Sequence, residues 1–228
     1  MIHTVMNESI VSRDASRTPH INYVSIAMIT VTVALLATVS WLWTSTSIVD
    51  LGVGTHLRKS GLAEQWARGD VVVMVRHAER CDRSVNTCLG SADGITVDGS
   101  RSALAVGAGL QRLGLEKTRM VASPMTRTRQ TAEFILGQTV QTQDWVSDCD
   151  GGFGDALITH KKPAENLVLI THSGCIDQFE RRMGVRGGDR SSAYAQAFFV
   201  KVDGRHPPKI IGSLDADQWA TLNIERLN

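Results

Sequence analysis

The stretch Val71-Val-Val-Met-Val-Arg-His-Ala-Glu-Arg80 decides how the rest of the chain is interpreted. Its first five residues are apolar and four of them are valine, which is typical of a short strand buried on both faces. The apolar run stops at Arg76-His77. Because open α/β sheets build their sites just beyond the carboxyl ends of strands, this pair predicts an anion site with a nucleophile or base beside it. Taken alone, the decapeptide fits equally well a strand that simply ends in polar residues.

A second strand ends in the same way. Asn166–Thr171 is strongly apolar, and His172 follows it, then a predicted helix to about Met183. A single histidine next to a core is usually structural. Here the chain repeats one pattern, a buried strand followed by a histidine, which favours a shared site.

The segment between these strands supplies a third element. Met120–Ala122 is predicted to be a short strand, and Ser123-Pro124 is typical of an N-cap followed by the first residue of a helix, which runs to about Leu136. Arg127 falls in the first turn of that helix, where a fixed cation adds to the anion affinity of the helix N-terminus. Further elements are a helix from about Ser100 to Leu113 and strands over Ala195–Val202 and Lys209–Leu214.

Strands that alternate with helices predict a three-layer α/β domain over residues 70–228, with a mostly parallel central sheet and helices on both faces. The carboxyl ends of its strands share one edge, so Arg76, His77, Arg127 and His172 are expected to converge. Two guanidiniums clamp phosphate oxygens, and one imidazole acts as the nucleophile. The other imidazole, protonated, would stabilise charge on those oxygens. This chemistry requires no metal and no cofactor.

The chain before this domain differs from it. Residues 1–20 are polar and predicted to be a disordered tail, whereas residues 21–49 carry no charged side chain and are about long enough for one transmembrane helix with aromatic residues at both ends. Residues 50–69 are expected to be a stalk with a helix over His56–Arg68. We expect an uncleaved signal anchor in the inner membrane, with the catalytic domain in the periplasm.

Composition narrows the function classes further. The 228 residues have a net charge of +1 and 43% are hydrophobic, which suits one globular domain plus an extra segment. A near-neutral chain is a poor candidate for a general nucleic-acid binder.

The four cysteines form no Cys-x-x-Cys pair, and their even count in an oxidising compartment favours two disulfides, for which three connectivities exist. We expect Cys81–Cys88 and Cys149–Cys175.

Three motifs, in this order along the chain, resemble those of the histidine phosphatase superfamily, phosphoglycerate mutase-like branch. They are Arg76-His77-Ala-Glu79, Ser123-Pro-x-x-Arg127-x-x-x-Thr131-Ala132 and Thr171-His172-Ser-Gly. The resemblance covers about residues 70–200 and implies a phosphohistidine intermediate on His77, with a phosphate pocket of Arg76, Arg127 and His172.

A longer stretch narrows the resemblance. Residues 76–84, together with Cys88-Leu89 and the Gly-Ile-Thr-Val run that starts at Gly94, resemble the lipopolysaccharide core heptose phosphatase group. Members of that group are periplasmic proteins with an N-terminal membrane segment. The resemblance extends to the positions of all four cysteines, which supports both export and pairing.

One departure concerns the acid that protonates the leaving alkoxide. Family members usually supply a carboxylic acid, often Glu, yet no Glu lies between Glu133 and Glu165. Asp148, Asp150 and Asp155 lie in that interval, and of these Asp150 and Asp155 are the preferred candidates.

The sequence therefore predicts a membrane-anchored periplasmic phosphomonoesterase. Its expected substrate is a phosphorylated small molecule or glycolipid, such as a heptose phosphate of the lipopolysaccharide core. Arg80 and Arg83 are expected to bind further anionic parts of that substrate, although solvated loop residues explain them equally well. Two alternatives stay open: a phosphatase of soluble phosphate esters or phosphoproteins, and a non-catalytic phosphate-binding regulatory protein, which only the missing Glu favours.

Overall fold

The computed structural model describes residues 22–44, 46–190 and 192–221, and within the first helix it describes side chains only up to Thr38. The chain divides into two compact units, Met1–Thr44 and Ser45–Asn228. The predicted tail over residues 1–20 lies outside the described residues.

Helix α1 (Tyr23–Thr44) makes up the described part of the first unit. Its large apolar side chains between Tyr23 and Leu36 are exposed. The hydroxyls of Thr30, Thr32 and Thr38 donate to carbonyl groups one turn earlier in the same helix. The helix expected within residues 21–49 is thus present. Across the part of the chain that the structure describes, however, no helix combines the length and the apolar character needed to cross a membrane.

The predicted stalk is part of the folded domain. The expected single helix is instead two, α2 (His56–Lys59) and α3 (Leu62–Arg68), separated at Gly61, whose φ of +67° is a left-handed conformation that ends a helix. Leu62 and Trp66 are buried in the core of the domain, and the Trp66 indole donates to the Gly114 carbonyl at 2.7 Å. A free-standing stalk over residues 50–69 was therefore the wrong expectation.

The second unit is built on one six-stranded sheet in the order β3-β2-β4-β1-β5-β6. Strands β1, β2, β3 and β4 run parallel to their neighbours among these four, whereas β5 pairs antiparallel with β1 and β6 pairs antiparallel with β5. The predicted strands all lie in this sheet. Their bounds are β1 (Val71–Arg76), β2 (Thr118–Ala122), β3 (Gln141–Thr142), β4 (Asn166–Thr171), β5 (Ala197–Lys201) and β6 (Lys209–Leu214).

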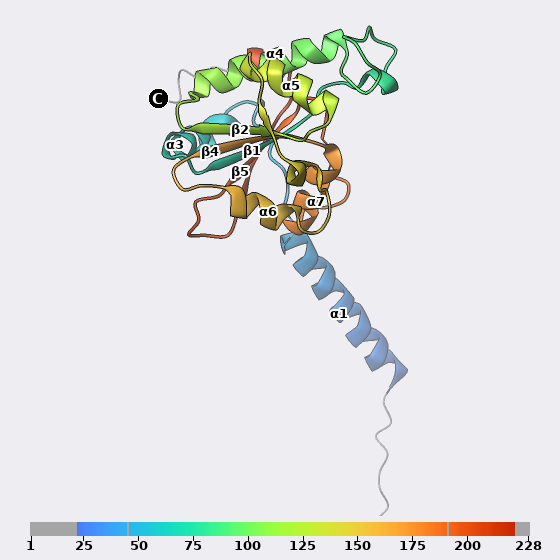
Figure 1. The fold of residues 1–228 in the computed structure, drawn as a ribbon. Helices are drawn as coiled ribbons and strands as arrows, with labels where there is room; N and C mark the ends of the chain where they lie inside the picture. Colours follow the sequence, from blue (N-terminus) through green and yellow to red (C-terminus); the bar gives the residue numbers. More distant parts are fainter. Residues whose placement is uncertain (1–21, 45, 191, 222–228) are drawn as a thin grey trace, which may run out of the picture. The chain divides into compact units, whose positions relative to one another are not determined.

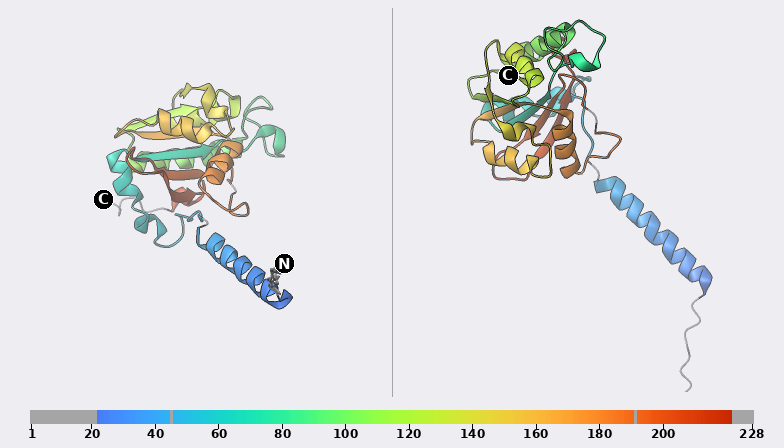
Figure 2. Two further views of the ribbon diagram at one scale, coloured as in Figure 1. Left: turned by 90° about the horizontal axis from the view of Figure 1, so that it is seen from below. Right: turned by 45° about the vertical axis from the view of Figure 1, so that its right-hand side comes forward.

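Helices cover both faces of the sheet, as Figures 1 and 2 show, so the predicted three layers are present. One face carries α4 (Val97–Leu113) and α5 (Thr126–Leu136), and the other carries α6 (Phe153–His160) and α7 (Ser173–Arg182). Short 3-10 turns complete the unit: η1 (Cys81–Arg83), η2 (Asp144–Ser147) and η3 (Gln218–Ala220).

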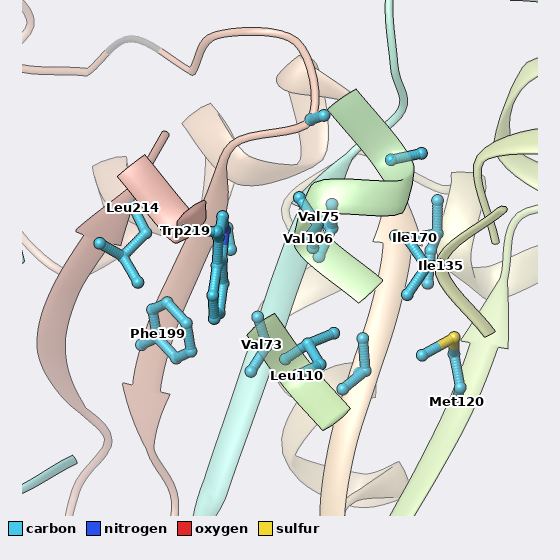
Figure 3. Packing of buried hydrophobic residues seen from close by; sticks show 14 of the residues in the cluster. Val73, Val75, Val106, Leu110, Met120, Ile135, Ile170, Phe199, Leu214 and Trp219 are labelled. Carbon is cyan, nitrogen blue, oxygen red and sulfur yellow. The ribbon is translucent and has the colours of Figure 1, made fainter. Parts of the chain in front are cut away.

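The central strand β1 shows why the sequence forms this sandwich. Val73 and Val75 belong to the core beneath α4 and α5, whereas Val72 and Met74 belong to the core beneath α6 and α7. Figure 3 shows the first of these cores, where Trp219 of η3 joins the same cluster of side chains. A Cβ at Gly109 of α4 would lie 1.8 Å from the Trp219 ring, so a glycine is needed there for this close packing.

Candidate active site

Both predicted histidines lie at the carboxyl edge of the sheet, directly after its two central strands. Arg76 at the end of β1 is in register with Thr171 at the end of β4, so His77 and His172 leave the sheet side by side. The His77 backbone N–H donates to the Thr171 carbonyl at 2.9 Å, and the two imidazole centroids are 5.4 Å apart in an edge-on arrangement. The parallel pairing of β1 and β4 thus assembles the histidine pair.

His77 is held as a neutral imidazole with one nitrogen free. Its side chain is almost fully buried, and its Nδ1 lies 2.8 Å from the Ala78 carbonyl. Because a carbonyl only accepts, Nδ1 carries the proton and the lone pair resides on Nε2. Burial, followed by the nearby His172, Arg127 and Arg76, lowers the pKa of His77 to about 3. At neutral pH the side chain is therefore an uncharged imidazole with a lone pair on Nε2.

His172 is oriented by two neighbours, Ser123 directly after β2 and Arg127 in the first turn of α5. The Arg127 guanidinium, which only donates, lies 3.4 Å from Nδ1, so Nε2 carries the proton and donates to Ser123 Oγ at 2.9 Å. Burial first, then Arg127 and Arg80, lower the pKa of His172 to about 4. His172 is therefore neutral at neutral pH in this structure, where the sequence led us to expect a protonated imidazole. A bound phosphate dianion would favour the charged form.

Ser123 has a different role from the N-cap that the sequence suggests. Helix α5 begins at Thr126, with Met125 as its N-cap residue and no side-chain cap. Ser123 is fully buried, and its carbonyl accepts from Thr128 Oγ1 at 2.8 Å. The hydroxyl of Ser123 accepts from the His172 Nε2–H and also from Thr128 Oγ1 of α5 at 3.3 Å, so it joins the helix to the histidine. Ser123 is a site residue that the sequence pattern did not indicate.

The two predicted phosphate-binding arginines are partly desolvated. Arg76 donates through Nη1 to the Ser192 carbonyl at 2.5 Å, and its guanidinium carbon lies 3.9 Å from the centre of the Tyr194 ring. The Nε atoms of Arg76 and Arg127 are both shielded from solvent and have no hydrogen-bond partner among the described residues. Burial is the largest cause that lowers the pKa of each arginine. Both guanidiniums are therefore short of anionic partners.

The loop after β1 adds further positive charge. Arg80 forms an ion pair with Asp82, which lies two residues further along, and Arg83 is exposed. Both Arg80 and Arg83 act electrostatically on Arg76 and Arg127, since each lowers the pKa of those two groups. The predicted pair thus lies within electrostatic range of the phosphate-binding arginines, although no polar contact joins them in the described part of the chain.

Glu79 and a disulfide fix this loop. The Glu79 carboxylate accepts from Ser84 Oγ, Asn86 Nδ2 and Thr96 Oγ1 at 3.0, 2.9 and 2.7 Å, and these bonds lower its pKa. The disulfide Cys81–Cys88 closes the same segment, with 5.3 Å between the Cα atoms. The second expected pair, Cys149–Cys175, is also bonded.

The candidate proton donors do not join the site. Asp155 pairs with both terminal nitrogens of Arg182 at 2.8 and 2.5 Å, its side chain is 67% exposed, and this pairing lowers its pKa. Asp150 accepts from the Gly152 N–H at 2.8 Å, and it is exposed, as is Asp148. Among the described residues, none of these carboxylates makes a polar contact with the two histidines or the two arginines.

Tyr194 is the second residue that the sequence analysis missed. Besides covering Arg76, its ring lies 5.8 Å from that of His77. It lies on an irregular loop, where no periodicity marks it. Only the antiparallel pairing of β5 with β1 brings this loop to the edge of the sheet where His77 and His172 lie.

The site as a whole is suited to a tetrahedral anion next to a nitrogen nucleophile. It combines two neutral imidazoles with guanidiniums that lack partners at Nε. Nowhere in the described ranges do three or more His, Cys, Asp or Glu side chains form a group able to hold a metal ion.

Known proteins resemble this chain over the same region. Residues 72–152 match the histidine phosphatase superfamily (branch 1). The lipopolysaccharide core heptose(II)-phosphate phosphatase of Salmonella newport is 38% identical over 109 residues, which are 46% of this chain and 54% of the relative. The enzyme of the same name from Salmonella arizonae is 36% identical over 120 residues, or 51% of this chain and 58% of the relative. The chain thus spans a little over half the length of these relatives.

Among solved structures, the protein histidine phosphatase SixA complexed with tungstate is 16% identical, with a TM-score of 0.49 over 64% of this chain and 97% of that one. The family match covers most of β1, together with His77, the loop after β1 and Arg127. Over residues 72–152 the chain is therefore similar to the histidine phosphatase superfamily (branch 1).

Proposed function

We propose that this protein is a phosphomonoesterase that works through a phosphohistidine on His77. Nε2 of His77 attacks phosphorus, and the bond from phosphorus to the substrate oxygen breaks as the N–P bond forms. Water then attacks the phosphohistidine, which releases inorganic phosphate and restores the imidazole. The observation that carries the proposal is a buried, neutral His77 whose Nδ1 proton is fixed by the Ala78 carbonyl, which leaves Nε2 as the nucleophile.

Charge complementarity supports a phosphate monoester as the group bound. The guanidiniums of Arg76 and Arg127 carry one positive charge each and both histidines are neutral, so their charge matches a phosphate dianion. The lowered pKa of both arginines reflects burial of charge without an anion. Phosphate oxygens would accept from these two guanidiniums, whose Nε atoms have no partner among the described residues.

The proposed substrate class is a sugar phosphate of envelope glycolipid, such as a heptose phosphate of the lipopolysaccharide core. This proposal is supported by the names of the relatives from two Salmonella strains. Arg80 and Arg83 would then contact further anionic groups of the glycolipid, and the exposed Arg83 is the better placed of the two because Asp82 already neutralises Arg80.

Attachment to the inner membrane through residues 21–49, with the phosphatase domain in the periplasm, is a separate proposal. It is supported by the absence of charged side chains over these residues, by the exposed apolar side chains of α1, and by the two disulfides, which are typical of an oxidising compartment. Carbonate extraction and protease treatment of spheroplasts test it. Retention in the membrane pellet with a protease-accessible domain is expected, and release of the chain by carbonate would contradict it.

Turnover of three substrates by the purified full chain in excess EDTA tests the function. The substrates are p-nitrophenyl phosphate, a phosphoserine peptide and phosphorylated lipopolysaccharide core. We expect phosphate release that is greatest from the core, and no release by His77→Ala. Greater turnover of the peptide would favour the phosphoprotein alternative. Binding of phosphate with no turnover of any substrate would leave the regulatory alternative.

A further inference from the structure

We propose that Tyr194 is a positioning residue for phosphate binding. Its ring covers the guanidinium of Arg76, and phosphate affinity depends on the contact between these two side chains. The inference rests on the proposed function in that it assigns phosphate to the site of Arg76, but it concerns binding rather than turnover.

The Arg76 guanidinium is held from two directions. The Tyr194 ring covers it at 3.9 Å from guanidinium carbon to ring centre, which is the distance of a cation–π contact. The Ser192 carbonyl accepts from Nη1 at 2.5 Å. These contacts occupy one face and one terminal nitrogen of the guanidinium. Nε, which is shielded from solvent and has no partner within the described residues, lies on an edge that they leave unpaired.

The loop that carries Tyr194 is fixed to the strand that carries Arg76. The Arg76 backbone N–H donates to the Gln196 carbonyl at 3.1 Å, and the Ala195 N–H donates to the His77 carbonyl at 3.4 Å. The Gln196 side chain in turn donates to Asp215 at 2.6 Å. The Tyr194 ring and the Arg76 side chain are therefore placed by backbone hydrogen bonds between this loop and the end of β1.

The backbone next to Tyr194 is strained. Ala195 is fully buried and has a φ of +56°, in the left-handed region that L-residues with a side chain rarely adopt. Such conformations persist where the surrounding structure enforces them, and they cluster at functional sites. Here the left-handed conformation of Ala195 directs the chain into β5 directly after Tyr194, the residue that covers Arg76.

A ring at this position has a specific consequence for an arginine. It excludes water from one face of the guanidinium and limits rotation of the group, so less side-chain entropy is lost when phosphate binds. The ring of phenylalanine would keep the cation–π contact but lose the side-chain hydrogen bond between Tyr194 and Arg76. An aliphatic side chain would fill the space but would lose the cation–π attraction.

Titration of inorganic phosphate, followed by 31P NMR, tests this on the full chain and does not depend on turnover. Tyr194→Leu is expected to raise the Kd by about 5- to 30-fold, the range of a partly desolvated cation–π contact. Tyr194→Phe, which keeps the ring, should raise the Kd less than Tyr194→Leu does. Where the unmodified chain turns over p-nitrophenyl phosphate, Tyr194→Leu should raise KM more than it lowers kcat. Trp145→Leu, which removes a ring stacked on His160 instead, should leave phosphate binding unchanged.

A double-mutant cycle distinguishes positioning from general damage to the site. In an Arg76→Gln background, Tyr194→Leu should change the Kd by less than about twofold, because its effect passes through the arginine. An equal loss in both backgrounds would overturn the proposal, as would unchanged binding in Tyr194→Leu, or a loss in Tyr194→Phe as large as that in Tyr194→Leu. If thermal unfolding shows that Tyr194→Leu does not fold, Tyr194→Met takes its place. Absence of turnover with these binding results intact would reject the proposed function alone.

Discussion

Burial of His77 should make the stability of this protein fall steeply in mild acid. The pKa of His77 drops from an ordinary value of 6.5 to about 3 in the fold. Between these values the unfolded chain binds a proton that the folded chain does not, so the free energy of unfolding decreases as pH falls. From about pH 7.5 to about pH 5 this single group accounts for a loss of about 2 kcal/mol. His172 adds a loss of the same sign, because its pKa is lowered to about 4.

Urea unfolding of the full chain at these two pH values, followed by tryptophan fluorescence, measures the effect. His77→Gln should reduce the difference in unfolding free energy between the two pH values by about 2 kcal/mol relative to the unmodified chain. His56→Gln, at an exposed histidine, is the matched control and should leave the difference unchanged. An undiminished difference in His77→Gln would refute the conclusion that burial keeps His77 neutral.

Three further predictions concern the surroundings of the site. Ser123→Ala removes the acceptor for the His172 N–H and should lower kcat/KM for p-nitrophenyl phosphate by about 3- to 10-fold, as measured in steady-state assays; an unchanged value would mean that this bond does not orient the imidazole. Asp155→Asn should leave the ratio of rates for alkyl and nitrophenyl phosphates unchanged, because Arg182 already binds that carboxylate; a selective loss with alkyl phosphates would identify Asp155 as the donor. Replacing both Cys81 and Cys88 by Ser should lower the free energy of unfolding by about 2.5 kcal/mol in urea titrations, and an unaltered midpoint would contradict this.

The sequence predicts the parts of this fold that depend on strong local patterns. The valine run of β1 and the apolar run of β4 are short, continuous and followed by histidine, and parallel pairing alone then places His77 beside His172. The two disulfides were also predicted correctly. Charge and periodicity thus suffice for the centre of the sheet and for the arginines and histidines at its edge.

Features that depend on long-range contacts were not predictable in this way. The break between α2 and α3 depends on the left-handed conformation of Gly61, and the bond between Ser123 and His172 joins residues distant in the sequence. Tyr194 reaches the site only through the antiparallel pairing of β5 with β1, a direction that the sequence pattern does not encode. The charge state of His172 likewise follows from burial, which a motif does not reveal.

The central claim is that Nε2 of His77 accepts the phosphoryl group. The most direct measurement mixes the full chain rapidly with p-nitrophenyl phosphate, quenches in alkali, where phosphohistidine persists, and maps the modified peptide by mass spectrometry. The account predicts one phosphoryl group on His77, released by mild acid and absent from His77→Ala. A phosphoryl group on His172 or on any other residue, or turnover that persists in His77→Ala, would contradict it.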